Sequence, residues 1–228
     1  MIGPDHPLKD FAMELTGDQT ADPKEFFTYY DAFAFWLFSK LKEMGGGKKI
    51  LDIGSKKMLN AINSAGNDVT SIVLKDCEDG ISNVKYIIQD AASPLPFADN
   101  YFDVFTSTAS LHVMGLNRYG DKLNPNALME LVRELDRVMK RQSNLIISLP
   151  LGRNALRFNS HWIFDLPAIE KLFHPWVLND HLVDHYPYDF EIAGFKKNYQ
   201  SRYTKDTGTA KLKEGDFYII FLHFKRGC

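Results

Sequence analysis

The sequence has few cysteines and no excess of charge of either sign. Its 228 residues include two cysteines, Cys77 and Cys228, which form neither a metal-ligand spacing nor a disulfide framework. A reducing compartment is therefore expected. The 27 basic and 29 acidic residues give a formal net charge of −2, so neither nucleic acid nor an anionic lipid surface is favoured as a partner. Small molecules or proteins are the expected partners.

Long hydrophobic runs are also absent. No stretch approaches about 18 uninterrupted apolar residues, and the first segment, MIGPDHPLKDF, lacks a basic stretch followed by an apolar one. Neither a membrane span nor secretion is predicted, and we expect a cytoplasmic protein. With 45% hydrophobic and 25% charged residues, a chain of this length can bury a core without disulfides.

From Lys48 onward, apolar runs alternate with helical patterns, which predicts a parallel sheet with crossover helices. The predicted strands are KILDI (49–53), DVTSIVL (68–74), VKYII (84–88), YFDVFTS (101–107) and NLIISL (144–149), and DFYIIFLHFKR (216–226) is expected to close the sheet. The most regular helix is NPNALMELVRELDRVMK, with Asn124 as its cap and Pro125 at its first position. A shorter helix, FDLPAIEKLF, follows the fifth strand.

An aromatic helix is predicted over 24–44, between Pro23 and the glycines 45–47. Its aromatic residues occupy too much of the circumference for one narrow core stripe. Part of the helix should therefore pack across a sheet edge or against another subunit, or cover a substrate pocket. We expect an N-terminal arm and aromatic helix (1–46), an α/β domain (47–228), and a homo-oligomer through this helix as one option.

Two polar segments follow adjacent predicted strands, so the fold should bring them to one cleft. They contain His112, Arg118, Tyr119 and Asp121, and Arg157, Asn159 and His161. His112 or His161 could remove a proton, because an imidazole titrates near neutral pH. Asp121 could orient that histidine, and Arg118 could hold an anionic group of the substrate.

Substrate binding is the expected role of Tyr119, Arg157 and Asn159. The alternative is an internal network that fixes the two loops, with Arg118 paired to Asp121. A metal site is conceivable from two of these histidines and one carboxylate, but no short-range ligand spacing supports it and no metal is expected.

Three further segments carry a resemblance: ILDIGS, DAASPLPFADNYFDVFTSTASLH and LMELVRELDRVMKRQSNLIISLP. Together they resemble the core of class I methyltransferases that use S-adenosylmethionine. Within that superfamily, HVMGLNRYGDKLNP and PLGRNALRFNSHWIF are similar to a methyltransferase-like family catalogued as a domain of unknown function. The resemblance implies an α/β, Rossmann-like fold, with a mostly parallel twisted sheet, an antiparallel C-terminal strand and an N-terminal helical extension.

The resemblance also implies S-adenosylmethionine as cofactor and a set of residues near it: Asp52, Gly54, Ser55, Val73, Asp90, Ala91 and Ser107. Gly54 lets the backbone pass close to the methionine part of the cofactor, because glycine has no Cβ. The alternative is a plain turn after the first strand. The later glycines of the pattern are replaced by Lys57 and Met58, whose side chains could crowd or shield the cofactor.

Two positions bear on the nucleoside. Val73 stands where the family pattern has an acidic residue for the ribose hydroxyls, and valine cannot accept those hydrogen bonds. Either Asp76 reaches back from the loop, or water and backbone hold the ribose, or the site has lost affinity. Asp90 stands where the superfamily commonly contacts the adenine amino group. The alternative for Asp90 is an Asx turn.

The leading hypothesis is methyl transfer to oxygen or nitrogen of a small polar acceptor, for example a sugar. One alternative is a catalytically inactive methyltransferase fold that acts as a binding or scaffold protein, with the aromatic helix as its partner surface. Another is a different reaction in the same cleft.

Overall fold

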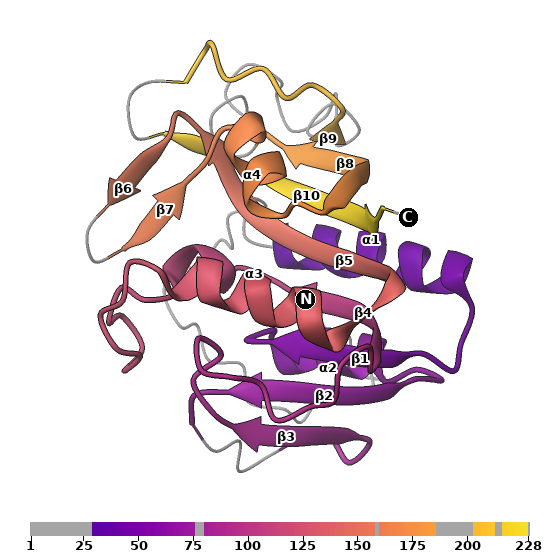
Figure 1. The fold of residues 1–228 in the computed structure, drawn as a ribbon. Coiled ribbons are helices and arrows are strands. Elements are labelled where there is room, and N and C mark those ends of the chain that lie inside the picture. Colours follow the sequence, from indigo (N-terminus) through magenta and orange to yellow (C-terminus); the bar gives the residue numbers. More distant parts are fainter. Residues whose placement is uncertain (1–28, 76–79, 158–159, 186–202, 213–215, 228) are drawn as a thin grey trace, which may run out of the picture.

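An eight-stranded sheet forms the centre of the computed structural model, which describes residues 29–75, 80–157, 160–185, 203–212 and 216–227 (Figure 1). The strand order is β3-β2-β1-β4-β5-β10-β8-β9. Five strands run parallel to one another: β1 (Lys49–Ile53), β2 (Asp68–Val73), β3 (Val84–Ile88), β4 (Phe102–Ser107) and β5 (Met139–Gly152). Strand β10 (Phe217–Arg226) runs antiparallel between β5 and β8 (Trp176–Asp184), and β9 (Tyr203–Thr204) lies beyond β8.

This architecture confirms the predicted fold class, a mostly parallel sheet with an antiparallel C-terminal strand. The prediction that this last strand closes the sheet is wrong, because β8 and β9 lie outside it. Strand β5 is also longer than predicted, since residues 139–143 continue its extended backbone directly from the preceding helix. A separate two-stranded hairpin is formed by β6 (Ala155–Arg157) and β7 (His161–Ile163).

Helices cover both faces of the sheet. They are α1 (Tyr29–Met44), α2 (Lys57–Asn63), α3 (Ala127–Val138) and α4 (Leu166–Leu172), with a 3-10 turn, η2, at Leu111–Val113. Alternate residues of a strand point to opposite faces. Accordingly, Leu51 packs with α3 in one buried cluster, and Ile50 packs with α1 in another. No helix in the described part of the chain has the length and apolar character needed to cross a bilayer.

Helix α1 packs on a face of the sheet, in a cluster with Ile50 of β1 and Phe221 of β10, and not across a sheet edge as one alternative predicted. Phe33 and Leu37 are fully buried, and the ring of Phe33 meets that of Phe221 on β10 edge-on, with centroids 5.3 Å apart. On its outer side Phe35 and Phe38 are exposed. The division of the chain at residue 46 and the association of two copies through α1 both stay predictions.

Helix α3 begins later than the sequence indicates. Asn124, Pro125, Asn126 and Ala127 form a turn in which Ala127 N donates to Asn124 O at 3.1 Å. Proline favours the second position of such a turn. Asn124 therefore does not cap the helix. Its side chain accepts from Asn126 N and donates to Glu130, while Asn126 occupies the cap position without a capping side-chain bond.

Candidate active site

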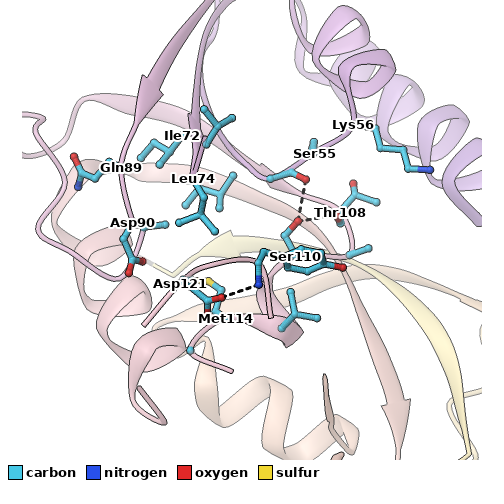
Figure 2. Close-up of a pocket in the computed structure, with 18 of the residues that line it drawn as sticks. Ser55, Lys56, Ile72, Leu74, Gln89, Asp90, Thr108, Ser110, Met114 and Asp121 are labelled. Atoms are coloured by element: carbon cyan, nitrogen blue, oxygen red, sulfur yellow. Dashed lines mark hydrogen bonds between the residues drawn. The ribbon is translucent and has the colours of Figure 1, made fainter. Parts of the chain in front are cut away.

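A cavity of about 340 Å³ lies at the carboxyl ends of β1, β2 and β4. Strand order reverses between β1 and β4, the place where open parallel sheets bind their ligands. Figure 2 shows residues of the loops after β1, β3 and β4 arranged around this space, with the end of β2 behind them. One wall residue, Tyr30, comes from α1.

The loop after β1 is held close to the loop after β4. Gly54 has a φ of +68°, and a Cβ on it would lie 2.3 Å from Ser110 Oγ. The Ser110 hydroxyl lies 2.9 Å from Gly54 O and 3.1 Å from Thr108 O (Figure 2). Glycine is therefore required at position 54 by its backbone conformation and by the approach of Ser110.

Two predicted cofactor residues lie beneath the cavity. Asp52 is fully buried and accepts hydrogen bonds from Ser71 Oγ and Thr106 Oγ1, both at 2.9 Å, and from Ser55 N at 3.4 Å. Burial raises the pKa of Asp52 above its usual value, and the hydrogen bonds from its partners offset only part of this shift. Ser107 is also buried, and its hydroxyl donates to Ile53 O at 2.8 Å. Through these hydrogen bonds, both residues hold together the strands and loops that carry the site.

Lys56, rather than Lys57 or Met58, lines the cavity. Lys56 occupies the cap position of α2 with an extended backbone, φ −62° and ψ 150°. Its Nζ lies 3.6 Å from the ring centroid of Tyr30. Lys57 and Met58 are exposed in the first turn of α2, so the expectation that they narrow the cofactor space is wrong.

Residues predicted to contact the nucleoside part of the cofactor also line this cavity. Ile72, Val73 and Leu74 line it from β2, and Asp90 and Ala91 line it after β3. Asp90 Oδ1 accepts from Ala92 N at 2.9 Å, so the Asx turn is present. This hydrogen bond occupies one carboxylate oxygen of Asp90, and Asp90 also borders the cavity. Asp76 lies outside the described residues.

The segment after β4 supplies the remaining wall. Tyr119 and Asp121 line the cavity, and Asp121 accepts from the backbone N–H groups of Asn117 and Tyr119 at 3.3 and 3.2 Å. The alternative pairing of Arg118 with Asp121 is wrong. Arg118 Nη1 instead donates to Ser160 O at 2.9 Å, which connects this loop to the β6–β7 hairpin.

The fold brings the two candidate bases together, but not to the cavity. The rings of His112 and His161 are 6.0 Å apart in a T-shaped contact. Burial, followed by the charges of His161 and Arg118, lowers the pKa of His112 to about 3. Burial and the neighbouring arginines also lower the pKa of His161. Both rings are therefore biased toward the neutral form, and neither lines the cavity.

The other predicted substrate residues are more scattered. Arg157 is exposed on β6 and does not line the cavity, and Asn159 lies outside the described residues. No group of three or more potential metal-ligating side chains is found in the part of the chain that is described. Among the wall residues, the side chains of Tyr30 and Lys56 were assigned no role from the sequence. The excess of aromatic residues on α1 was a signal for Tyr30, whereas nothing in the sequence separates Lys56 from Lys57.

The sheet order and the placement of the cavity define a protein with the class I methyltransferase fold. A family model described as "Caenorhabditis protein of unknown function, DUF268" matches residues 45–213, and the chain belongs to this family. This confirms the resemblance to a family catalogued as a domain of unknown function. No curated protein matches the sequence.

Solved structures show the same fold at low sequence identity. The 1,6-didemethyltoxoflavin-N1-methyltransferase of Burkholderia thailandensis, with S-adenosylhomocysteine bound, has a TM-score of 0.59 and 12% identity over 91% of this chain and 82% of its own. The YcgJ protein of Bacillus subtilis has a TM-score of 0.56 and 16% identity over 86% and 98%. The cyclase SpnF has a TM-score of 0.56 and 18% identity over 83% and 79%. These similarities establish the fold.

Proposed function

We propose that the protein is a methyltransferase that binds S-adenosylmethionine in the cavity at the ends of β1, β2 and β4. The observation that carries this proposal is the cavity itself, which lies at the switch point of the sheet. Its volume of about 340 Å³ is in the range of small-molecule sites. The Burkholderia methyltransferase with the same fold binds S-adenosylhomocysteine, which supports the assignment.

The cavity walls fit the chemistry of this cofactor. Figure 2 shows Ile72 and Leu74 on one side and Met114 on the other, apolar surfaces suited to a flat purine. Asp90 would accept a hydrogen bond from the adenine amino group. The hydroxyl of Thr108 is buried at the wall and has no hydrogen-bond partner among the described residues. Val73 offers the ribose hydroxyls no carboxylate.

When bound, the cofactor supplies an electrophilic methyl group. The chain's own task is then to hold the acceptor in line and to take up its proton. We assign this task to Tyr119 and Asp121, because both line the cavity. A carboxylate beside a tyrosine ring suits hydroxyl groups on a compact apolar frame, which supports a small polar acceptor such as a sugar, methylated on oxygen or nitrogen.

In this proposal the two histidines are not the bases that take up the proton. A pKa near 3 makes His112 a weak proton acceptor, and neither ring lines the cavity in which the acceptor would bind. We assign His112, His161 and Arg118 to positioning the segment that carries Tyr119 and Asp121. Arg118 does so through its bond to Ser160 O.

A second reaction class has two observations in its favour. Val73 removes a hydrogen-bond acceptor that a nucleoside ligand would use, and SpnF, of the same fold, is a cyclase. A different reaction in the same cleft is therefore the rival to methyl transfer. Release of S-adenosylhomocysteine from S-adenosylmethionine in the presence of sugar acceptors supports transfer. Binding of the cofactor with no acceptor-dependent release supports the rival.

The nucleoside pocket is tested by Asp90→Asn. The amide keeps an oxygen for the turn bond to Ala92 N but presents an NH₂ group where the carboxylate would accept the adenine amino group. We expect S-adenosylhomocysteine to bind about tenfold or more weakly, the effect of losing a hydrogen bond to a charged group. The analogue with hypoxanthine in place of adenine should lose less, since its carbonyl can accept from the new amide.

The matched control is Asp68→Asn. It makes the same chemical change at the exposed amino end of β2, away from the cavity. Calorimetric titration should give the wild-type affinity for this control. An unchanged affinity in Asp90→Asn would mean that the adenine lies elsewhere.

A further inference from the structure

The charges around the cavity are unevenly placed. Its wall holds two carboxylates, Asp90 and Asp121, and Lys56 is the one lysine or arginine among the described residues that line it. In Figure 2, Lys56 and Asp90 lie at opposite ends of the drawn pocket, with Asp121 below the centre. A ligand with a negative and a hydrogen-bond-donating end is therefore favoured in one orientation only.

Lys56 is also held in place. Its Nζ sits over the ring of Tyr30 at 3.6 Å, and Tyr30 is stacked on Tyr29 with centroids 4.2 Å apart. A lysine ammonium group is attracted to the face of an aromatic ring, which limits the conformations of its long side chain. Both tyrosines belong to α1, which is anchored on the sheet through Phe33. Helix α1 thus contributes to the cavity by fixing its cation.

The backbone explains why this lysine faces the cavity. Lys56 precedes the first turn of α2 and is extended, whereas Lys57 is the first helical residue. The change of conformation between them sends the two side chains in different directions. Two consecutive lysines therefore differ in role, one on the cavity wall and one on the exposed surface of α2.

We propose that Lys56 binds the carboxylate at the amino-acid end of the cofactor and so selects S-adenosyl amino acids over nucleosides that lack a carboxylate. This role rests on the proposed function. Asp90 repels a carboxylate at its own end of the cavity, and Lys56 attracts it at the opposite end. Because Lys56 is exposed, water and salt screen the interaction, and its contribution is moderate.

The test compares two ligands in two variants. S-adenosylhomocysteine carries the carboxylate, and 5′-methylthioadenosine retains the nucleoside and sulfur without it. Lys56→Met should weaken S-adenosylhomocysteine about fivefold and change 5′-methylthioadenosine less than about twofold, as expected for an exposed ion pair. Lys57→Met makes the same charge change one residue away and should leave both affinities within about twofold. In the wild type, about 1 M salt should narrow the preference for S-adenosylhomocysteine.

The results distinguish the proposed role of Lys56 from the proposed function of the protein. Equal binding of S-adenosylhomocysteine by Lys56→Met and Lys57→Met overturns the role of Lys56 and leaves the proposed function standing. An equal loss of both ligands in Lys56→Met also overturns it, since the lysine would then support the pocket and not the carboxylate. If the wild type binds neither ligand, the proposed function fails and this role with it.

Discussion

Replacing Gly54 by alanine tests whether the loop after β1 is held by Ser110. Gly54 has a φ of +68°, a conformation that costs an L-residue roughly 1–2 kcal/mol. An added Cβ would also lie 2.3 Å from Ser110 Oγ and 2.7 Å from Ser110 Cβ. Rotation of the hydroxyl cannot relieve the second contact, so the backbone near Ser110 must move.

The expected loss of stability in Gly54→Ala follows from the backbone strain and from the contact with Ser110. Moving Ser110 lengthens or breaks the hydrogen bonds of its hydroxyl to Gly54 O and Thr108 O. A hydrogen bond contributes about 0.5–1.5 kcal/mol to stability. Together with the strain, Gly54→Ala should lower the free energy of unfolding by about 2–4 kcal/mol. Gly66 is the control, because its φ is +75° and a Cβ there meets nothing within 4 Å. Gly66→Ala should cost only the strain, about 1–2 kcal/mol.

Urea unfolding of both variants measures these values. For a chain of this size, each kcal/mol corresponds to about 2–4 °C in the melting temperature, which gives a second readout. In a Ser110→Gly background the contacts at positions 54 and 110 disappear, and Gly54→Ala should then cost no more than Gly66→Ala. Equal costs at positions 54 and 66 in the wild type would refute the close approach, as would an unchanged cost in the Ser110→Gly background.

Two further predictions concern His112 and Val73. Because the pKa of His112 falls from 6.5 to about 3 on folding, the unfolded chain binds more protons between these values, and stability should decrease as the pH falls through this range. At pH 4.5 the loss from this residue is about 2–3 kcal/mol, and urea unfolding of His112→Phe should show a flatter pH profile; an identical profile would contradict the assignment. Val73→Asp places a carboxylate at the predicted ribose position and should strengthen S-adenosylhomocysteine binding about fivefold by calorimetry. An equal gain for the 2′,3′-dideoxyribose analogue would show that the hydroxyls are not its target.

The sequence predicted the strands that lead into the cavity well, because each is a short apolar run bounded by polar or turn residues. It missed β8, where Asn179, Asp180 and His181 interrupt the apolar pattern. That strand is defined by its pairing with β10 and by contacts such as the ion pair between Lys40 and Asp180. Both come from distant parts of the chain and leave no local pattern.

Some features of the candidate site were predicted from the sequence and others were not. Gly54 and Asp90 lie within two residues of a strand end, so the fold class alone places them at the carboxyl edge. The proximity of His112 and His161 was also predicted, and their rings lie 6.0 Å apart. Their separation from the cavity was not predicted, because it depends on how the β6–β7 hairpin packs. The role of the Lys56 side chain was not predicted, because its orientation depends on which residue begins α2, a boundary that sequence patterns locate only to within a few residues.

The central claim is that the cavity at the ends of β1, β2 and β4 binds S-adenosylmethionine. Its most direct test is a calorimetric titration of the wild-type protein with S-adenosylhomocysteine, the product form of the cofactor. The account predicts saturable binding of one ligand per chain, weakened in Asp90→Asn and unaffected in Asp68→Asn. Absence of heat and of any thermal shift at millimolar ligand would contradict it.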